Sequence, residues 1–181
     1  AIQYVASGEL PKLYMVQGHG EVAINGDVKS KVDISNYQIE DLTLATQEAV
    51  PGDADILMIN GAQSDLSTYE ADLIRDYMDN EGNLVVFLDV YTKDLPNLDG
   101  LLRSYGVAMQ DCFVIETDPN HIGSNTPVFL WPVIESDEIT DPIISSGYPI
   151  GIYLAKGIEI LDQRRLHFRR MPLAKQRSNP E

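Results

Sequence analysis

The stretch ADILMINGAQSDLSTYEADLIRDYMDNEGNLVVFLDV, residues 54–90, decides the fold class of this chain. It opens with a nearly continuous apolar run (54–61), continues with a helical pattern (67–81) and closes with a second apolar run (84–90). Continuous apolar runs of this length are typical of strands that are buried on both faces, as in parallel sheets. The stretch therefore predicts a strand, a helix and a second strand of one parallel sheet.

The helix in this stretch carries its own start and stop signals. Ser67 and Glu70 have the spacing of a capping box, and Gly82 stands where a glycine that ends a helix is expected. Leu66, just before the start signal, and four residues within the helix give one apolar face; the four are Leu73, Ile74, Tyr77 and Met78. We therefore predict a helix over 67–81.

The same patterns recur on either side of this stretch. Strands are predicted at 12–18, 38–45 and 107–116, and helices within 22–35 and at 95–106, where Gly106 ends the helix. A polar loop (117–127) and short strand-like runs (128–134 and 150–161) follow. This order predicts an α/β fold in three layers, with a mostly parallel central sheet, helices on both faces and extra strands in the C-terminal third. We expect one domain over 1–161.

Charge is distributed unevenly along the 181 residues, whose formal net charge is −15. Residues 156–181 carry seven Lys or Arg and three acidic residues, whereas 1–155 carry six basic and 25 acidic residues. An acidic main body repels phosphate backbones, which argues against nucleic-acid binding. Residues 162–181 are interpreted as a basic segment, either an edge strand or a truncated continuation of the domain.

Neither the apolar runs nor the cysteine count supports a membrane span or a disulfide framework. The longest apolar runs, such as 84–88, have four or five residues, whereas a span needs about 20. The chain begins at Ala1 without a targeting pattern, so we expect a cut-out or processed piece from which a targeting or anchoring segment is missing. Cys112 is the single cysteine, and its apolar surroundings predict a buried, inert thiol.

Polar residues follow three of the predicted strands and mark the candidate site. In an open α/β sheet, ligands bind beyond the carboxyl ends of the strands, where the strand order reverses. The side chains placed at this edge are His19, Glu21, Asn60, Gln63 and Asp89. The segment Gly-His-Gly-Glu (18–21) also reads as a sharp turn, with Gly18 and Gly20 in conformations that other residues resist and Glu21 in the first turn of the next helix. We interpret the five side chains as hydrogen-bonding contacts for a partner or ligand.

Sequence motifs for catalysis and for cofactors are missing from this edge. The segment YTKDLPN (91–97), where a nucleophile elbow is expected, has no Cys or Ser between glycines, and no G-x-S-x-G motif occurs. GHGEVAING (18–26) fits no phosphate-binding loop. His19 with Glu21, and His121 with Asp118, lack the spacing of a metal site. We therefore predict no enzyme activity, no metal and no cofactor.

Several segments, read in order, resemble one family. They are YMVQGHGE (14–21), NYQIEDLTLA (36–45), VPGDADILMINGAQSDLSTYEADLIRDYMDNEGNLVVFLDV (50–90), LPNLDGLLRSYGV (95–107), CFVIETD (112–118), PVIESDEITDPI (132–143) and GIYLAKGIEIL (151–161). Together they resemble the Gldg family of gliding-motility-associated proteins, which are auxiliary proteins of uncharacterized ABC-type transport systems. NEGN (80–83) stands where the family commonly has a double glycine, and NGAQ (60–63) where it often has Gly-Pro.

This resemblance implies both a fold and a setting. The fold is flavodoxin-like, similar to class I glutamine amidotransferases without their catalytic residues. Such proteins are membrane-anchored, with this domain outside the cytoplasm beside the permease and ATPase of an exporter. A related domain in an intraflagellar-transport protein is used for protein assembly. The family pattern also continues past residue 181, so the chain is expected to stop inside its parent domain.

These observations lead to one leading hypothesis and two alternatives. The leading hypothesis is a non-catalytic extracytoplasmic domain of an ABC-transporter auxiliary protein, which binds a partner subunit or a small polar ligand. The first alternative is a domain that senses sugars or the cell wall, because the edge is polar and the surface acidic. The second is a divergent amidotransferase-like hydrolase that uses His19 and Asp89.

Overall fold

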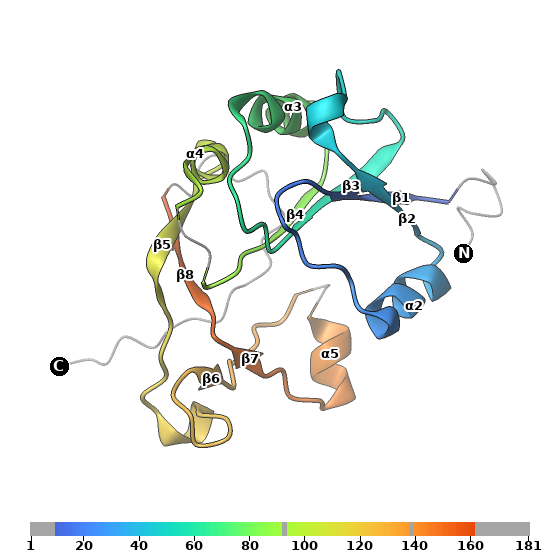
Figure 1. Ribbon diagram of the computed structural model, residues 1–181. Coiled ribbons are helices and arrows are strands. Elements are labelled where there is room, and N and C mark those ends of the chain that lie inside the picture. Colours follow the sequence, from blue (N-terminus) through green and yellow to red (C-terminus); the bar gives the residue numbers. More distant parts are fainter. Residues whose placement is uncertain (1–9, 92–93, 138–139, 162–181) are drawn as a thin grey trace. The chain divides into compact units, whose positions relative to one another are not determined.

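The computed structural model describes residues 10–91, 94–137 and 140–161 (Figure 1). The chain forms two compact units, Ala1–Leu101 (the N-terminal unit) and Leu102–Glu181 (the C-terminal unit). The basic segment predicted at 162–181 lies outside the described residues. Among those that are described, no helix combines the length and apolar character that a membrane span requires.

The N-terminal unit is built on a four-stranded sheet with the strand order β2-β1-β3-β4. All neighbouring strands in it are parallel, which confirms the prediction of an α/β fold with a parallel central sheet. The strands are β1 (Lys12–Val16), β2 (Gln38–Leu42), β3 (Ala54–Asn60) and β4 (Leu84–Phe87). The chain runs outward from β1 to β2 and, in the other direction, from β3 to β4, so the order reverses between β1 and β3.

Helices cover both faces of this sheet (Figure 1). The helix α2 (Gly26–Ile34) connects β1 to β2, and α3 (Thr68–Asp79) connects β3 to β4. Because parallel crossovers are right-handed, helices that connect strands in opposite directions lie on opposite faces. A short 3-10 helix, η1 (Leu44–Thr46), precedes β3, and α4 (Pro96–Ser104) follows β4. The side chains with the least exposure are Val16, Leu44, Leu57, Ile59, Leu66, Ile74, Leu98 and Leu101.

The two faces of the sheet are buried to different extents, which corrects the prediction for 54–61 and 84–90. Leu57 and Ile59 are fully buried, but Ile56 and Met58, on the opposite face of β3, are only half-buried. This face is less covered because α2 buries none of its side chains. β4 is the edge strand of the sheet in the described residues, and Phe87 at its end is 56% exposed.

The sequence predicted the start of α3 correctly but not the residue that ends it. The capping box of Ser67 and Glu70 is present. The left-handed residue after the helix, however, is Glu81 (φ 66°), and not Gly82 as predicted. Gly82 packs against the ring of Tyr77, where an added Cβ would lie 2.5 Å from Cε1. A glycine stands at this position because the aromatic ring leaves no room for a side chain.

The C-terminal unit is made of short antiparallel pairs. β5 (Val107–Phe113) pairs with β8 (Lys156–Ile160), and β6 (Phe129–Leu130) pairs with β7 (Ile152–Tyr153). Between them lie the 3-10 helix η2 (Pro119–His121) and α5 (Asp141–Ser146). The helix α5 was not predicted, because it has only six residues, buries none of them and so leaves no apolar period in the sequence.

Two sequence expectations fall at the start of this unit. Gly106, two residues after the end of α4, has a left-handed conformation (φ 83°), which agrees with its predicted role in ending that helix. Cys112 is exposed, so the prediction of a buried thiol was wrong. The described part of β5 pairs with β8 alone, in a two-stranded sheet, and such a sheet leaves the outer half of the strand open to solvent.

Candidate functional site

The connection from β1 to α2 crosses the carboxyl end of β3 and fills the point where the strand order reverses. Gly18 (φ 123°) and Gly20 (φ 76°) both have left-handed backbones, as the sequence predicted, and they turn the chain on either side of His19. The His19 carbonyl accepts hydrogen bonds from the backbone N–H groups of Gln63 (2.7 Å) and Ser64 (3.0 Å). The chain's own loop therefore occupies the crevice in which related α/β sheets bind ligands.

His19 lies between two carboxylates beneath this edge. Its Nδ1 is 3.0 Å from Oε1 of Glu21, and its Nε2 is 3.2 Å from Oε2 of Glu70. The His19 backbone N–H also donates to Oε2 of Glu21 at 2.8 Å. These side chains are buried, with exposed fractions of 9% for His19, 1% for Glu21 and 5% for Glu70. We call this group the Glu21–His19–Glu70 triad.

Each ring nitrogen of His19 faces a carboxylate in the triad. An ionised carboxylate only accepts hydrogen bonds, so a ring nitrogen pairs with it by donating a hydrogen. Polar groups that are hydrogen-bonded to one another in this way can be buried, whereas a single unpaired charge could not.

Glu70 links the triad to the first turn of α3. Its Oε2 accepts hydrogen bonds from the backbone N–H of Ser67 (2.9 Å) and from the Ser67 hydroxyl (2.7 Å). Burial raises the pKa of Glu70, but the hydrogen bonds from Ser67 and the charge and hydrogen bond of His19 outweigh it, so the pKa lies below its ordinary value. Glu70 is therefore held ionised where it faces His19.

Glu21 does not stand in the first turn of the following helix, as the sequence suggested. The helix α2 begins at Gly26 and is capped by Asn25, whose side chain accepts a hydrogen bond from the backbone N–H of Val28. Glu21 instead turns back to His19, because two left-handed glycines bring its carboxylate over the His19 backbone N–H. Sequence reasoning treated Glu70 as a helix cap only, and no local signal places it beside His19.

The accessible part of the edge is formed by Gln63 and Asp89. Nε2 of Gln63 donates to Oδ2 of Asp89 (3.0 Å) and to the Gly61 carbonyl (2.9 Å). Oδ1 of Asp89 accepts the backbone N–H of Tyr91 at 2.8 Å. Gln63 is exposed and Asp89 half-buried. These two side chains present polar atoms at the surface in a fixed arrangement.

Asn60, the fifth residue predicted at this edge, is used within the fold. Its Nδ2 donates to the Val22 carbonyl at 2.6 Å, and its own carbonyl accepts the Val22 backbone N–H at 2.8 Å. The structure thus brings all five predicted side chains to one edge of the N-terminal unit. It divides them into a structural group (His19, Glu21 and Asn60) and an accessible pair (Gln63 and Asp89).

The arrangement offers little to a catalytic mechanism or to a metal ion. Both ring nitrogens of His19 are engaged, and the Ser67 hydroxyl faces Glu70 rather than an imidazole. In the part of the chain that the structure describes, no group of three or more His, Cys, Asp or Glu residues could hold a metal. His121, the other histidine considered for metal binding, directs Nδ1 to the Trp131 carbonyl at 2.9 Å.

Comparison with known proteins assigns the chain to a family. The family model described as "ABC-type uncharacterized transport system" matches residues 10–168. The chain belongs to this family. Membership associates it with an ABC-type transport system, as an auxiliary component, and so with a process at a membrane. No curated protein matches the chain.

A solved structure shares the fold of this member of the transport-system family. It is titled "mmIFT52 N-terminal domain" and has a TM-score of 0.63 and 15% sequence identity, covering 83% of this chain and 69% of its own. At this identity the likeness shows the fold alone.

Proposed function

We propose that this chain is a non-catalytic domain of a membrane-anchored auxiliary protein of an ABC-type transport system, on the extracytoplasmic side of the membrane. The domain binds a partner subunit, or a small polar ligand, at the carboxyl edge of the parallel sheet. The partners are the permease and the ATPase, reached through the full-length protein. The family assignment supports the transport setting. Kinship with Gldg proteins and an amidotransferase-like fold are part of the proposal.

One observation carries the proposed binding edge. The buried Glu21–His19–Glu70 triad holds the β1–α2 loop in place, and at the accessible part of the same edge Gln63 is hydrogen-bonded to Asp89. A polar surface that is already ordered loses little conformational freedom on binding, and this favours recognition. The edge also offers a donor and an acceptor side by side, which suits hydrogen bonds to a protein backbone or to a polar ligand.

The state of His19 supports the non-catalytic part of the proposal. A general base needs a free ring nitrogen that can reach the substrate proton. His19 directs both nitrogens to buried carboxylates, and its side chain is only 9% exposed. Asp89, the other residue of the hydrolase alternative, is hydrogen-bonded to Gln63 and to the Tyr91 backbone. The geometry favours binding over hydrolysis.

The test uses the accessible pair, because replacing the buried triad would disturb the fold. The full-length protein carrying Gln63→Ala with Asp89→Ala is co-purified from membranes with its permease and ATPase. Gln110→Ala with Asp111→Ala is the matched control, since both of these residues are exposed and lie in the C-terminal unit. We expect the edge variant to lose the transporter subunits and the control to keep them. Equal recovery with both variants would overturn the proposal.

The same material distinguishes the two alternatives. Ester, amide and glutamine substrates test for a hydrolase. Turnover that Asp89→Asn abolishes in a folded protein would replace the non-catalytic proposal. Thermal-shift measurements with sugars and muropeptides test for a sensing domain, because a ligand that binds the folded state raises its melting temperature. A shift that Gln63→Ala removes would identify the small-ligand form of the proposed site.

A further inference from the structure

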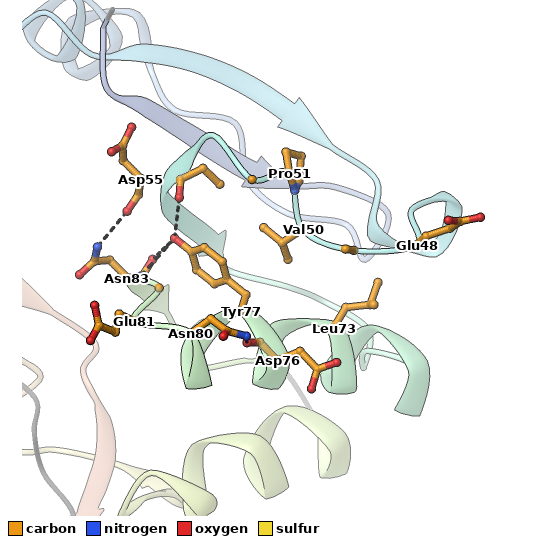
Figure 2. Close-up of a pocket in the computed structure, with 14 residues that line it drawn as sticks. Glu48, Val50, Pro51, Asp55, Leu73, Asp76, Tyr77, Asn80, Glu81 and Asn83 are labelled. Atoms are coloured by element: carbon orange, nitrogen blue, oxygen red, sulfur yellow. Dashed lines mark hydrogen bonds between the residues drawn. The ribbon is translucent and has the colours of Figure 1, made fainter. Parts of the chain in front are cut away.

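A groove of about 430 Å³ lies at the opposite end of the same sheet, where β3 and β4 begin (Figure 2). One wall is the turn 48–52, which leads into β3. The other wall consists of the C-terminal half of α3 and the segment 80–83. The sequence predicted a candidate site only at the carboxyl ends of the strands, and not at either wall of this groove.

Apolar side chains form part of the inner surface of this groove. Val50 and Pro51 face Leu73 and Tyr77 across it (Figure 2). The Tyr77 hydroxyl donates a hydrogen bond to the Ala54 carbonyl (3.2 Å) and accepts one from the backbone N–H of Asn83 (3.1 Å). These hydrogen bonds hold the ring in place against the start of both strands, so the groove is a formed feature of the surface.

The outer edge of the groove is acidic. Among the residues that line it are Glu48, Asp55, Asp76 and Glu81, and none is Lys, Arg or His. Asp55 accepts the Lys12 backbone N–H at 2.8 Å. The carboxylates of Glu48, Asp76 and Glu81 are exposed and have no hydrogen-bond or ion-pair partner within the described ranges. Like charges gathered around an apolar cleft create a negative potential there.

We propose that this groove is a docking surface for a basic segment of a partner protein. The segment inserts an apolar side chain between Pro51 and Tyr77 and presents Lys or Arg to the surrounding carboxylates. Charge complementarity indicates which partner binds. The carboxylates around the groove repel acidic segments, and they attract and orient basic segments as these approach. The surface goes beyond the proposed function, because it lies at the other end of the sheet from Gln63 and Asp89.

Gly52 is a position where a side chain can be added to the wall of the groove. It lines the groove, an added Cβ meets no atom within 4 Å, and its φ is not left-handed. Gly52→Leu therefore changes this wall at little structural cost. Gly26→Leu is the matched control, because Gly26 has the same open surroundings and lies on α2.

The charges are tested by a second pair of variants. Glu48→Gln, Asp76→Asn and Glu81→Gln together remove the three unpaired carboxylates. Asp27→Asn, Asp33→Asn and Asp111→Asn together change the net charge equally at exposed positions elsewhere, which controls for attraction to an acidic protein in general.

The probe is a fluorescein-labelled peptide of Lys, Arg and Leu, compared with the same peptide carrying Glu in place of Lys and Arg. Binding is followed by fluorescence anisotropy at low and high salt, and the contact residues are mapped by amide chemical shifts. We expect the basic peptide to shift residues of 48–52 and 73–83, and the groove variants to weaken its binding about tenfold while both controls bind as wild type. The acidic peptide should not bind.

Three results would overturn the proposal. They are no binding of the basic peptide, equal weakening by the control variants, and shifts that map away from the groove. The two proposals are tested by different variants and can fail separately. The carboxyl-edge variant tests the proposed function, and Gly52→Leu with the carboxylate variants tests the docking surface.

Discussion

His19 and Glu70 come from segments 51 residues apart, yet Nε2 of His19 lies 3.2 Å from Oε2 of Glu70 in the interior of the N-terminal unit. The contact joins the loop after β1 to the first turn of α3, and so it joins the two halves of the sheet on either side of the reversal in strand order. This link adds to the backbone hydrogen bonds that connect the loop after β1 to the end of β3.

His19→Ala should destabilise the fold by about 3 kcal/mol, because it leaves two buried carboxyl groups without their shared hydrogen-bond partner. Glu70→Ala should cost a similar amount. The double variant should be less destabilised than the sum, with a coupling of about 1 kcal/mol or more, since the two side chains share one interaction. Urea unfolding of the four proteins measures this cycle. Additive losses would mean that the two side chains act independently.

The stability should depend on pH through Glu70. Its pKa is lower in the fold than the ordinary value of 4.5, so the unfolded chain binds the proton more readily. The contribution of Glu70 is therefore complete above that value and is lost as the pH falls through the folded pKa. Urea titrations of wild type and Glu70→Gln at several pH values should show the wild-type advantage shrinking in acid. A constant difference would contradict this assignment.

The sequence predicted the fold from signals that are local. The alternation of apolar runs with a capped helix over 54–90 determines the order of strand, helix and strand, and each part of that pattern is read within a few residues. The sequence predicted the ends of the strands less accurately. β4 ends at Phe87, three residues before the apolar run 84–90 does. Whether a strand is central or at an edge depends on its neighbours in space, which the run itself does not show.

The sequence predicted which edge of the sheet carries the candidate residues, but not which side chains they contact. The edge residues His19, Gln63 and Asp89 could be grouped because parallel strands end together. The partner of His19 could not be found, since Glu70 reads as a helix cap, and only the packing of α3 on the sheet brings its carboxylate to the ring. The groove at the other end of the sheet could not be predicted from the sequence for a similar reason. The turn 48–52 faces Tyr77 only because β3 and α3 pack together.

Gly20→Ala should destabilise the N-terminal unit by about 1–2 kcal/mol. Gly20 has φ 76°, and a Cβ there would lie 3.1 Å from Cβ of Gln63, so the change adds backbone strain and a close contact. Gly52→Ala is the control, because Gly52 has open surroundings and no left-handed φ. We expect it to leave the stability unchanged or slightly higher. Thermal unfolding of both variants compares them, and equal effects would contradict the role given to Gly20.

Glu81→Gly should stabilise the protein by about 0.5–1 kcal/mol. Glu81 has φ 66° directly after the α3 cap, a conformation that glycine adopts without the strain of a side chain. Gly82→Ala, one residue later, should instead destabilise it by about 1–3 kcal/mol, because the new methyl group overlaps the ring of Tyr77. Chemical denaturation should give opposite signs for these neighbours. Matching signs would show that the chain does not turn at Glu81.

Gln63→Ala with Asp89→Ala should change the free energy of unfolding by less than about 1 kcal/mol, since Gln63 is exposed, Asp89 is half-buried and neither belongs to the apolar core. The pair can then report on binding without loss of fold, whereas any variant of His19 changes both. Urea unfolding of the purified domain, run beside co-purification of the full-length protein with its transporter, separates the two effects. A large loss of stability in the edge variant would mean that the hydrogen bond from Gln63 to Asp89 supports the sheet itself and is not free to serve a partner.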